Sequence, residues 1–303
     1  MRAADLFAGA GGFSTGAVKA GCEVVFAANH WPAAVNVHKA NHPDTFHACQ
    51  DLQQFNFHEV PDIDILLASP ACQGHSKAKG KEKPHHDALR NTAWAVVSCV
   101  EAKLPPFVVV ENVPDFTKWV LYRPWCAAMN ALGYALNPMI LDASITRGSP
   151  QSRPRLFIVC TRSKHPIELK FPERERRTAR DVIDFNAGNW SPIICKRRSP
   201  KTLARVEAGR RVFGDQFLIA YYGSTKGGWS LDRPIGTLTT KERYAVVNGD
   251  RMRMVSIDEG RQFMGFPESY ILPKSKKDAW KMVGNAVEVI QSFDIINAIK
   301  EAA

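Results

Sequence analysis

The sequence predicts an α/β fold, with a mixed, mostly parallel sheet covered by helices on both faces and a small irregular lobe. Through the first 160 residues, short β-branched runs alternate with helix-like segments, which is typical of a doubly covered sheet. From about residue 163 to 232 this alternation gives way to short pieces rich in Arg, Gly and Pro. We therefore expect a first domain (1–162), an irregular lobe (163–232) and a return segment (233–303) that completes the first domain.

The individual elements follow from hydrophobic periodicity. Residues 31–40 and 87–103 have helical spacing, and no internal repeat is visible. The strand candidates are 3–7, 23–28, 45–49, 64–69, 107–111, 134–141 and 155–160.

The last segment, AVEVIQSFDIINAIKEA, is amphipathic. Its apolar face would consist of Val289, Phe293 and Ile296, or of Ile290, Phe293 and Ile299. We expect this helix to dock back on the first domain.

The composition is that of a globular protein, with 303 residues, 45% hydrophobic and 23% charged. No apolar run approaches the roughly 20 residues of a membrane span. Met1 directly precedes the first strand-like run, so we expect no signal peptide and a cytoplasmic protein. The seven cysteines form no C-x-x-C pair, which argues against a zinc site and a disulfide framework.

Positive charge is concentrated in one part of the chain. The net charge is +10, and Arg162 to Arg211 contains 14 Lys and Arg against 6 Asp and Glu. Such a run is often only a solvated face. Here it is interleaved with Phe171, Phe185 and Trp190, a pattern that indicates a polyanion such as nucleic acid.

Functional groups follow the predicted strands at one edge of the sheet, where open parallel sheets bind ligands. The first strand is followed by FAGAGGFS, and the second by Asn29. Asp51 follows the third strand, Cys72 the fourth, and Glu111 with Asn112 the fifth. This convergence predicts a ligand site at that edge.

Each motif also has a structural explanation. Gly9, Gly11 and Gly12 permit a tight turn, but their spacing is not G-x-G-x-x-G and no phosphate-binding Lys follows, so a ligand would carry no pyrophosphate. Cys72 could simply end a strand, and Glu111 could cap a helix or be a buried acid with a raised pKa. In QSRPRLF, Gln151, Arg153 and Arg155 would alternate along a strand, so the two arginines would share a face and need an acidic or ligand partner.

Six ordered motifs together resemble the DNA cytosine-5 methyltransferase family. They cover nearly the whole chain outside 163–232, and they are DLFAGAGGFS, SPACQGHS, ENV, QSRPR, RPIGTLTT and GNAV. The resemblance implies a Rossmann-like methyltransferase fold, S-adenosylmethionine as cofactor and double-stranded DNA as partner. It also implies that 163–232 is the target-recognition lobe, that no metal is needed and that the protein is a monomer.

The resemblance implies covalent catalysis, because carbon 5 of cytosine is a poor nucleophile. Cys72 would attack carbon 6 of a flipped-out cytosine, and Glu111 would bind ring nitrogen 3 and the exocyclic amine. Arg155, with Arg153 beside it, would hold the base oxygen. Gln73 to about His86 would form a mobile loop that closes over the base.

The resemblance also assigns binding residues. Those for the cofactor are Phe7, Ala8, Gly9, Gly11, Gly12, Asn29, His30, Asp51, Leu52, Pro70, Asn285 and Ala286. Those for the nucleic acid are Gln73, Ser76, Lys77, Lys79, Asn112, Gln151, Arg197, Arg198 and Thr239.

Two positions depart from the family pattern. Asn29 stands where the family has an acid that accepts hydrogen bonds from both ribose hydroxyls, so we expect weaker ribose recognition. Ala71 stands where proline generally precedes the cysteine, and proline would fix φ. We expect Cys72 to remain competent, because Ser69, Pro70 and Gln73 are in place.

Three alternatives stay open from the sequence. One is a tRNA cytosine-5 methyltransferase of the same family, and another is a catalytically silent DNA-binding homologue. The third, a nucleotide-dependent oxidoreductase, is disfavoured by the glycine spacing and by the missing second-strand acid. The target sequence and the biological role are not determined, although compactness favours a bacterial or phage setting.

Overall fold

The computed structural model describes residues 1–71, 92–144, 148–196, 198–222 and 225–303. The chain divides into two compact units. The first contains Met1–Asp142, Pro154–Glu173 and Ala286–Ala303, and the second contains Ala143–Arg153 and Arg174–Asn285. The second unit therefore takes in residues 233–285, which the sequence-based division had assigned to the first domain.

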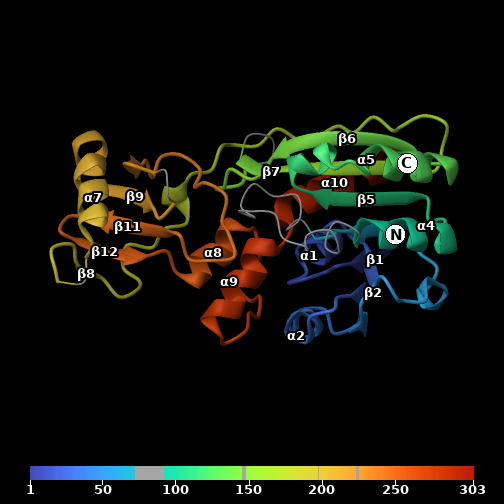
Figure 1. Ribbon diagram of the computed structural model, residues 1–303, viewed down its shortest axis with the longest axis horizontal. Coiled ribbons are helices and arrows are strands. Elements are labelled where there is room, and N and C mark those ends of the chain that lie inside the picture. The colour runs from blue at the N-terminus through green and yellow to red at the C-terminus, as the bar shows by residue number, and fades with distance from the viewer. Residues whose placement is uncertain (72–91, 145–147, 197, 223–224) are drawn as a thin grey trace. The chain divides into compact units, whose positions relative to one another are not determined.

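The first unit is built on a seven-stranded sheet (Figure 1), in the order β3-β2-β1-β4-β5-β7-β6. Pairing is parallel from β3 through β5, whereas β7 runs antiparallel to both β5 and β6. The sheet is thus mixed and mostly parallel, as predicted. Its strands are β1 (Arg2–Leu6), β2 (Glu23–Ala28), β3 (Phe46–Ala48), β4 (Ile65–Ala68), β5 (Phe107–Asn112), β6 (Ala135–Asp142) and β7 (Pro154–Thr161).

Helices cover both faces of this sheet, as the alternation predicted. They are α1 (Gly12–Lys19), α2 (Pro32–Asn41), α4 (Thr92–Lys103), α5 (Tyr122–Ala131) and α10 (Val289–Ala302), with short 3-10 turns η1 (Phe57–Glu59) and η3 (Pro114–Lys118). A helix is expected over 87–103, and α4 confirms it for residues 92–103. Residues 87–91 lie outside the described part of the chain.

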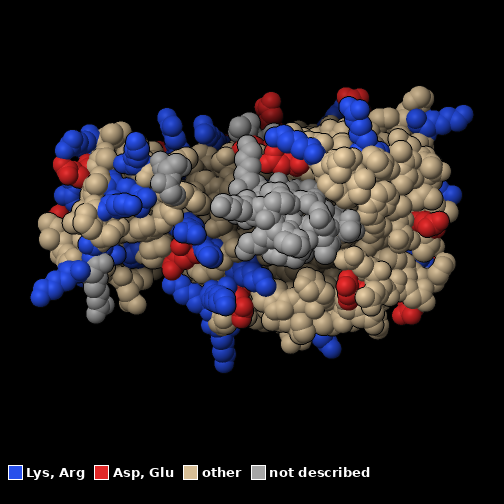
Figure 2. Space-filling model, in the orientation of Figure 1, with Lys and Arg blue, Asp and Glu red and all other residues tan. Residues whose placement is uncertain are grey.

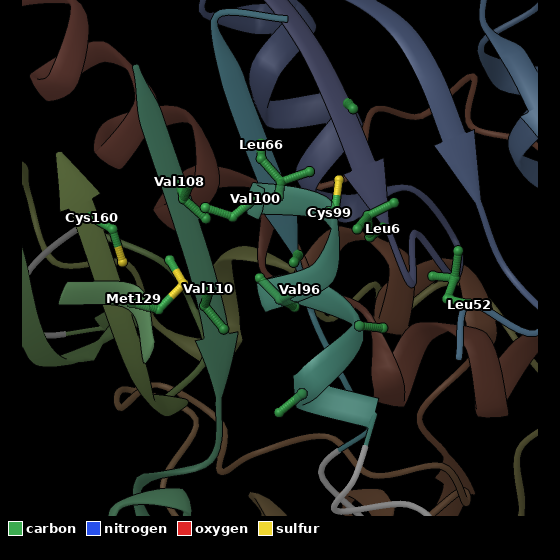
Figure 3. Close-up of a cluster of buried hydrophobic side chains, with 14 of the residues drawn as sticks. Leu6, Leu52, Leu66, Val96, Cys99, Val100, Val108, Val110, Met129 and Cys160 are labelled. Carbon is green, nitrogen blue, oxygen red and sulfur yellow. The ribbon is translucent and has the colours of Figure 1, made fainter. Parts of the chain in front are cut away.

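The buried core has two layers because successive strand residues point to opposite faces. Val108 and Val110 pack with Val96 and Cys99 of α4, as Figure 3 shows for this side of the sheet. Val109 packs on the opposite side, with α1 and α10. Strands buried on both faces require near-continuous apolar runs, and ILLA and FVVV are such runs.

The C-terminal helix α10 docks on the first unit, as expected. Its most buried apolar residues include Ile295, Ile296 and Ile299, whereas Phe293 is only partly buried. Gly16 of α1 permits the close approach, because a Cβ there would lie 2.3 Å from Ser292 Oγ. The face proposed from the sequence was therefore only partly correct.

The second unit contains a five-stranded sheet of order β10-β9-β11-β12-β8, in which every pairing is antiparallel. The helix α7 packs against this sheet through a small apolar cluster that includes Val206, Phe217 and Ile219. The elements are η4 (Ala179–Asp181), β8 (Ser191–Pro192), α7 (Pro200–Phe213), β9 (Gln216–Ala220), β10 (Gly228–Trp229), β11 (Tyr244–Asn248), β12 (Arg251–Met254), α8 (Ile257–Phe263) and α9 (Lys276–Asn285).

Candidate active site

The glycine-rich turn after β1 has an unusual backbone. Phe7, Gly9 and Gly11 adopt φ values of 61°, 55° and 80°, in the left-handed region that glycine tolerates and phenylalanine rarely adopts. A Cβ at Gly12 would lie 2.0 Å from the Val287 carbonyl oxygen, so this glycine is needed for packing. Strain of this kind is characteristic of ligand sites, and it brings backbone groups to the carboxyl edge of the sheet.

A buried polar network connects the two residues, Asp5 and Ser14, that flank this turn in the sequence. Asp5 Oδ2 accepts hydrogen bonds from Ser14 Oγ (2.7 Å) and from Ser14 N–H (3.2 Å). Burial raises the pKa of Asp5 to about 7, although the Ser14 hydrogen bonds oppose the shift. Sequence reasoning missed this network, because Asp5 lies inside an apolar strand.

Three histidines extend the network to the neighbouring elements. His38 Nε2 lies 2.9 Å from Ser14 Oγ, and His38 Nδ1 lies 2.8 Å from His47 Nε2. The His42 ring lies against the His38 ring at an angle of 39°, and His42 Nε2 lies 3.3 Å from Thr15 Oγ1. Burial lowers the pKa of all three, that of His42 to about 4, so they are neutral near pH 7.

The end of β2 is shaped by Asn29. Its Oδ1 accepts the Trp31 N–H at 2.9 Å, and its own N–H donates to the Ala48 carbonyl at 3.1 Å. The side-chain oxygen is therefore already engaged in the turn before α2. His30, the next residue, is exposed.

The β3 edge presents a carboxylate beside an apolar surface. Asp51 is exposed, and its Oδ1 accepts the Gln53 N–H at 3.0 Å. Leu52 is buried and lines a cavity of about 450 Å³ together with Phe55, Phe57 and Trp94.

Glu111 and Arg155 form an ion pair across neighbouring strands. Arg155 Nε lies 2.9 Å from Glu111 Oε1, with the two side chains 13% and 9% exposed. Glu111 faces Phe157 in the antiparallel pairing of β5 with β7. Glu111 is therefore a strand residue, and the partner expected for Arg155 is this carboxylate.

The segment that leads to Cys72 is fixed by hydrogen bonds. Ser69 Oγ donates to the Phe7 carbonyl at 3.2 Å, and Asn112 Nδ2 donates to the Pro70 carbonyl at 3.2 Å. The Ala71 N–H donates to Thr92 Oγ1 at 3.1 Å. Cys72 itself lies outside the described residues.

A family model described as C-5 cytosine-specific DNA methylase matches residues 1–301. The chain belongs to the C-5 cytosine-specific DNA methylase family. Like the motifs, the match spans both units of the methylase.

Curated relatives of the methylase are type II methyltransferases. M.MthTI of Methanothermobacter thermautotrophicus is 27% identical and matches 99% of this chain and 97% of its own length. M.HhaI of Haemophilus parahaemolyticus is 28% identical and matches 95% of this chain and 91% of its own length.

Solved structures share the fold of the methylase. A DNA modification methyltransferase described as encoded within an E. coli prophage superimposes with a TM-score of 0.75 at 19% identity, covering 100% of this chain and 99% of its own. Spodoptera frugiperda DNMT2 gives 0.69 at 18% identity, covering 99% and 98%.

In the methylase, Gln151 and Arg153 do not lie on the strand of Arg155, because β7 begins at Pro154. The prediction that the two arginines share a strand face was therefore wrong. Gln151 Oε1 accepts the Leu238 N–H at 2.7 Å, and Arg153 donates to the carbonyls of Leu238 (3.2 Å) and Gly284 (3.0 Å). Both side chains are buried and contact Leu238 of the RPIGTLTT segment, and Arg153 also contacts Gly284, the first residue of GNAV; all of these residues belong to the second unit.

Other predicted site residues occupy varied positions. Asn285 is exposed at the end of α9 and Ala286 is buried. Thr239 Oγ1 donates to the Lys241 carbonyl, and Arg198 donates to Ser191 Oγ. The predicted residues outside the described part of the chain are Cys72, Gln73, Ser76, Lys77, Lys79 and Arg197.

The described residues contain neither a metal-binding cluster nor a membrane-spanning helix. No group of three or more His, Cys, Asp or Glu there could hold a metal ion. No helix in that part of the chain is long and apolar enough to cross a membrane.

Proposed function

We propose that this methylase uses S-adenosylmethionine to methylate carbon 5 of a flipped-out cytosine in double-stranded DNA, through a covalent adduct of Cys72. Methylation of DNA cytosine is the activity of the family. The observation that carries the catalytic assignment is the buried ion pair of Glu111 with Arg155. The next residue after Glu111 is Asn112, whose side chain donates a hydrogen bond to the segment before Cys72.

The chemistry assigned to Cys72 and Glu111 follows from the electron demand of the ring. The Cys72 thiolate forms a bond to carbon 6, and the electron pair of the carbon 5–carbon 6 double bond makes carbon 5 an enamine carbon with charge at ring nitrogen 3. Glu111 stabilises that charge through a hydrogen bond or proton at nitrogen 3 and accepts from the exocyclic amine. Once carbon 5 carries the methyl group that the cofactor supplies, a base removes the carbon 5 proton. The electron pair of that C–H bond re-forms the carbon 5–carbon 6 double bond and releases Cys72 as a thiolate, which restores the aromatic ring.

Arg155 has a positioning part in this proposal. Its contact with Glu111 fixes the carboxyl group before substrate arrives, and its remaining guanidinium N–H groups can donate to the base oxygen. We do not assign Arg153 a place beside Arg155, because the Arg153 guanidinium donates to two carbonyls of the second unit. We assign Arg153 and Gln151 to bracing rather than to contact with the base.

The first unit fits S-adenosylmethionine. Phe7, Gly9 and Gly11 make a turn with positive φ values, and among the described residues a Cβ at Gly9 would meet only the Phe7 carbonyl oxygen, so the backbone on that side is suited to approach by a ligand. Asp51 is exposed and suited to accept from an adenine amine, beside apolar Leu52. When bound, the cofactor supplies the methyl group.

The second unit is suited to bind the DNA backbone. Residues 143–153 and 174–285 contain 24 Lys and Arg against 12 Asp and Glu, a charge of +12. The first unit contains 16 against 18, a charge of −2. In Figure 2 the basic side chains gather over the second unit around α7. Such a charge favours a polyanion and carries no sequence information by itself.

Covalent trapping tests the proposal. Duplex DNA with 5-fluorocytosine is incubated with protein and S-adenosylmethionine, and the adduct is detected by its mobility under denaturing conditions. Because fluorine cannot leave as a proton does, wild-type protein should remain attached. Cys72→Ala should give no adduct, whereas Cys49→Ala, which changes an exposed thiol, should leave adduct formation unchanged. No wild-type adduct, or an adduct with Cys72→Ala, would contradict the mechanism.

The nucleic-acid class is tested separately. Methyl incorporation from labelled S-adenosylmethionine is compared between duplex DNA and tRNA under identical conditions. Incorporation into DNA is expected, and incorporation into tRNA alone would assign the protein to the RNA-acting alternative. Binding without any incorporation would indicate the catalytically silent alternative.

A further inference from the structure

The residue before Cys72 keeps a backbone N–H that a proline would lack. The resemblance to the family implies proline at this position, and this chain has Ala71. The Ala71 N–H is used, because it donates to Thr92 Oγ1 at 3.1 Å. This hydrogen bond could not exist with proline at residue 71.

Thr92 is attached to a rigid part of the first unit. It is the first described residue of α4, whose Ala93 is buried in the core together with Val96, Cys99 and Val100, the three that Figure 3 labels. The carbonyl of Ala93 also accepts the indole N–H of Trp125 at 3.0 Å. The hydroxyl of Thr92 is therefore a fixed acceptor.

The bond completes a set of contacts to three consecutive residues. The Ser69 N–H donates to the Leu6 carbonyl, and the Ser69 hydroxyl donates to the Phe7 carbonyl. Pro70 is held by Asn112, and Ala71 by Thr92. These contacts come from β1, β5 and α4, so the backbone is restrained from three elements directly before Cys72.

Alanine would otherwise leave this segment less restrained. Proline limits φ to about −65°, whereas alanine can populate several backbone regions. A hydrogen bond to a fixed hydroxyl removes that freedom by another route. We propose that Thr92 is a positioning residue for the nucleophile and that its hydroxyl, acting through the Ala71 N–H, replaces the restraint of the family's proline. This inference rests on the proposed role of Cys72.

The test compares Thr92→Val, Ala71→Pro and the double variant. Thr92→Val keeps the shape of the side chain and removes the hydroxyl, and it should lower kcat by about ten- to a hundredfold, because small misplacements of a reacting group are costly. Affinity for S-adenosylmethionine should not change. The double variant, in which the proline ring supplies the restraint, should regain most of the lost rate. Thr92→Ser should retain wild-type rate.

Controls separate positioning from a general loss of stability. Ser98→Ala removes another hydroxyl of α4, which donates to the Trp94 carbonyl, and should leave kcat unchanged. Each variant is also examined by thermal unfolding. Equal rates for Thr92→Val and wild type would overturn the inference, and so would a double variant slower than Thr92→Val. If wild-type protein itself gives no adduct with 5-fluorocytosine DNA, the proposed function fails instead.

Discussion

At the scale of single residues, the Glu111–Arg155 pair is the main determinant of the proposed chemistry. Glu111→Gln keeps the size of the side chain and removes the group that can donate a proton to ring nitrogen 3. We predict a loss of about 10²- to 10⁴-fold in kcat, with smaller effects on the affinity for duplex DNA. Rates from methyl incorporation and affinities from fluorescence anisotropy provide the comparison.

The matched control for this prediction is Glu59→Gln. Glu59 is an exposed carboxylate of η1, and its neutralisation should leave kcat within twofold or so of wild type, as is usual for surface changes away from a site. Comparable rates for Glu111→Gln and Glu59→Gln would remove Glu111 from the mechanism.

Asn29 gives a prediction about the cofactor. The Asn29 oxygen already accepts the Trp31 N–H, so it is poorly placed to accept from both ribose hydroxyls. Asn29→Asp keeps that contact at the same side-chain length and adds a second, charged acceptor. We expect tighter binding of S-adenosylmethionine, by about three- to tenfold, since one charged hydrogen bond is worth roughly 1 kcal/mol or more.

Calorimetric titration of both proteins measures this difference in Kd. The longer Asn29→Glu variant should also bind more tightly if the ribose lies within reach. Unchanged or weaker binding by both variants would show that residue 29 does not limit ribose recognition.

The histidine network gives a prediction about acid stability. The pKa of His42 is about 4 in the folded protein and about 6.5 as an ordinary histidine. As the pH falls from 6.5 toward 4, the unfolded chain binds a proton at His42 that the folded chain does not bind, so the free energy of unfolding falls. Asp5 acts in the opposite sense. Because burial raises the pKa of Asp5 to about 7, its contribution to the free energy of unfolding is present at low pH and is lost as the pH rises toward 7.

We therefore expect His42→Gln to lose less stability on acidification than wild type, by about 1–2 kcal/mol after allowance for partial exposure. Urea unfolding at pH 7 and pH 4.5 measures the effect, with His165→Gln as an exposed control. Parallel losses for wild type and His42→Gln would contradict the prediction.

At the scale of elements, the contact between α1 and α10 depends on the absence of a side chain. A Cβ at Gly16 would lie 2.3 Å from Ser292 Oγ and 2.8 Å from the Phe293 nitrogen. Alanine is the better helix former by about 1 kcal/mol, so propensity alone would favour Gly16→Ala. Overpacking should outweigh that gain and destabilise the protein by about 1–3 kcal/mol.

Chemical denaturation of Gly16→Ala tests this balance. Gly227→Ala is the control, because a Cβ there would meet no atom of the described residues within 4 Å. A Gly16→Ala variant as stable as wild type would show that α10 can shift away from α1 at little cost.

The accuracy of the sequence predictions also varies with the element. Short apolar runs bounded by turn residues located all seven strands of the first sheet, because strands buried on both faces need such runs. The course of residues 151–155 was not predictable, because the alternation of Gln151, Arg153 and Arg155 imitates a strand. Arg153 donates hydrogen bonds to Leu238 and Gly284, which are distant in the sequence, so the local pattern does not reveal them.

Parts of the candidate site were predictable and others were not. The order of strand ends located Asn29, Asp51, Glu111 and the segment before Cys72, since parallel strands place their carboxyl ends at one edge. The partners of these residues were not visible, because the pairing of Glu111 with Arg155 depends on the antiparallel register of β5 and β7. The restraint of Ala71 by Thr92 likewise spans 21 positions.

At the scale of the whole molecule, the two units differ in charge as well as in architecture. The second unit has a charge of +12 and the first a charge of −2, so attraction to DNA should come chiefly from the second. We predict that the affinity for duplex DNA falls steeply with salt, with a slope in log–log form of about −0.9 for each phosphate neutralised. Anisotropy titrations at salt concentrations between about 50 and 200 mM measure this slope. A slope near zero would contradict electrostatic binding through the second unit.

The identity of the methylated product tests the central claim most directly. Duplex DNA is incubated with the protein and S-adenosylmethionine, digested to nucleosides and analysed by mass spectrometry against authentic standards. The account predicts 5-methylcytosine with wild-type protein and none above background with Cys72→Ala. Methylation on the exocyclic nitrogen, or 5-methylcytosine formed equally well by Cys72→Ala, would contradict it.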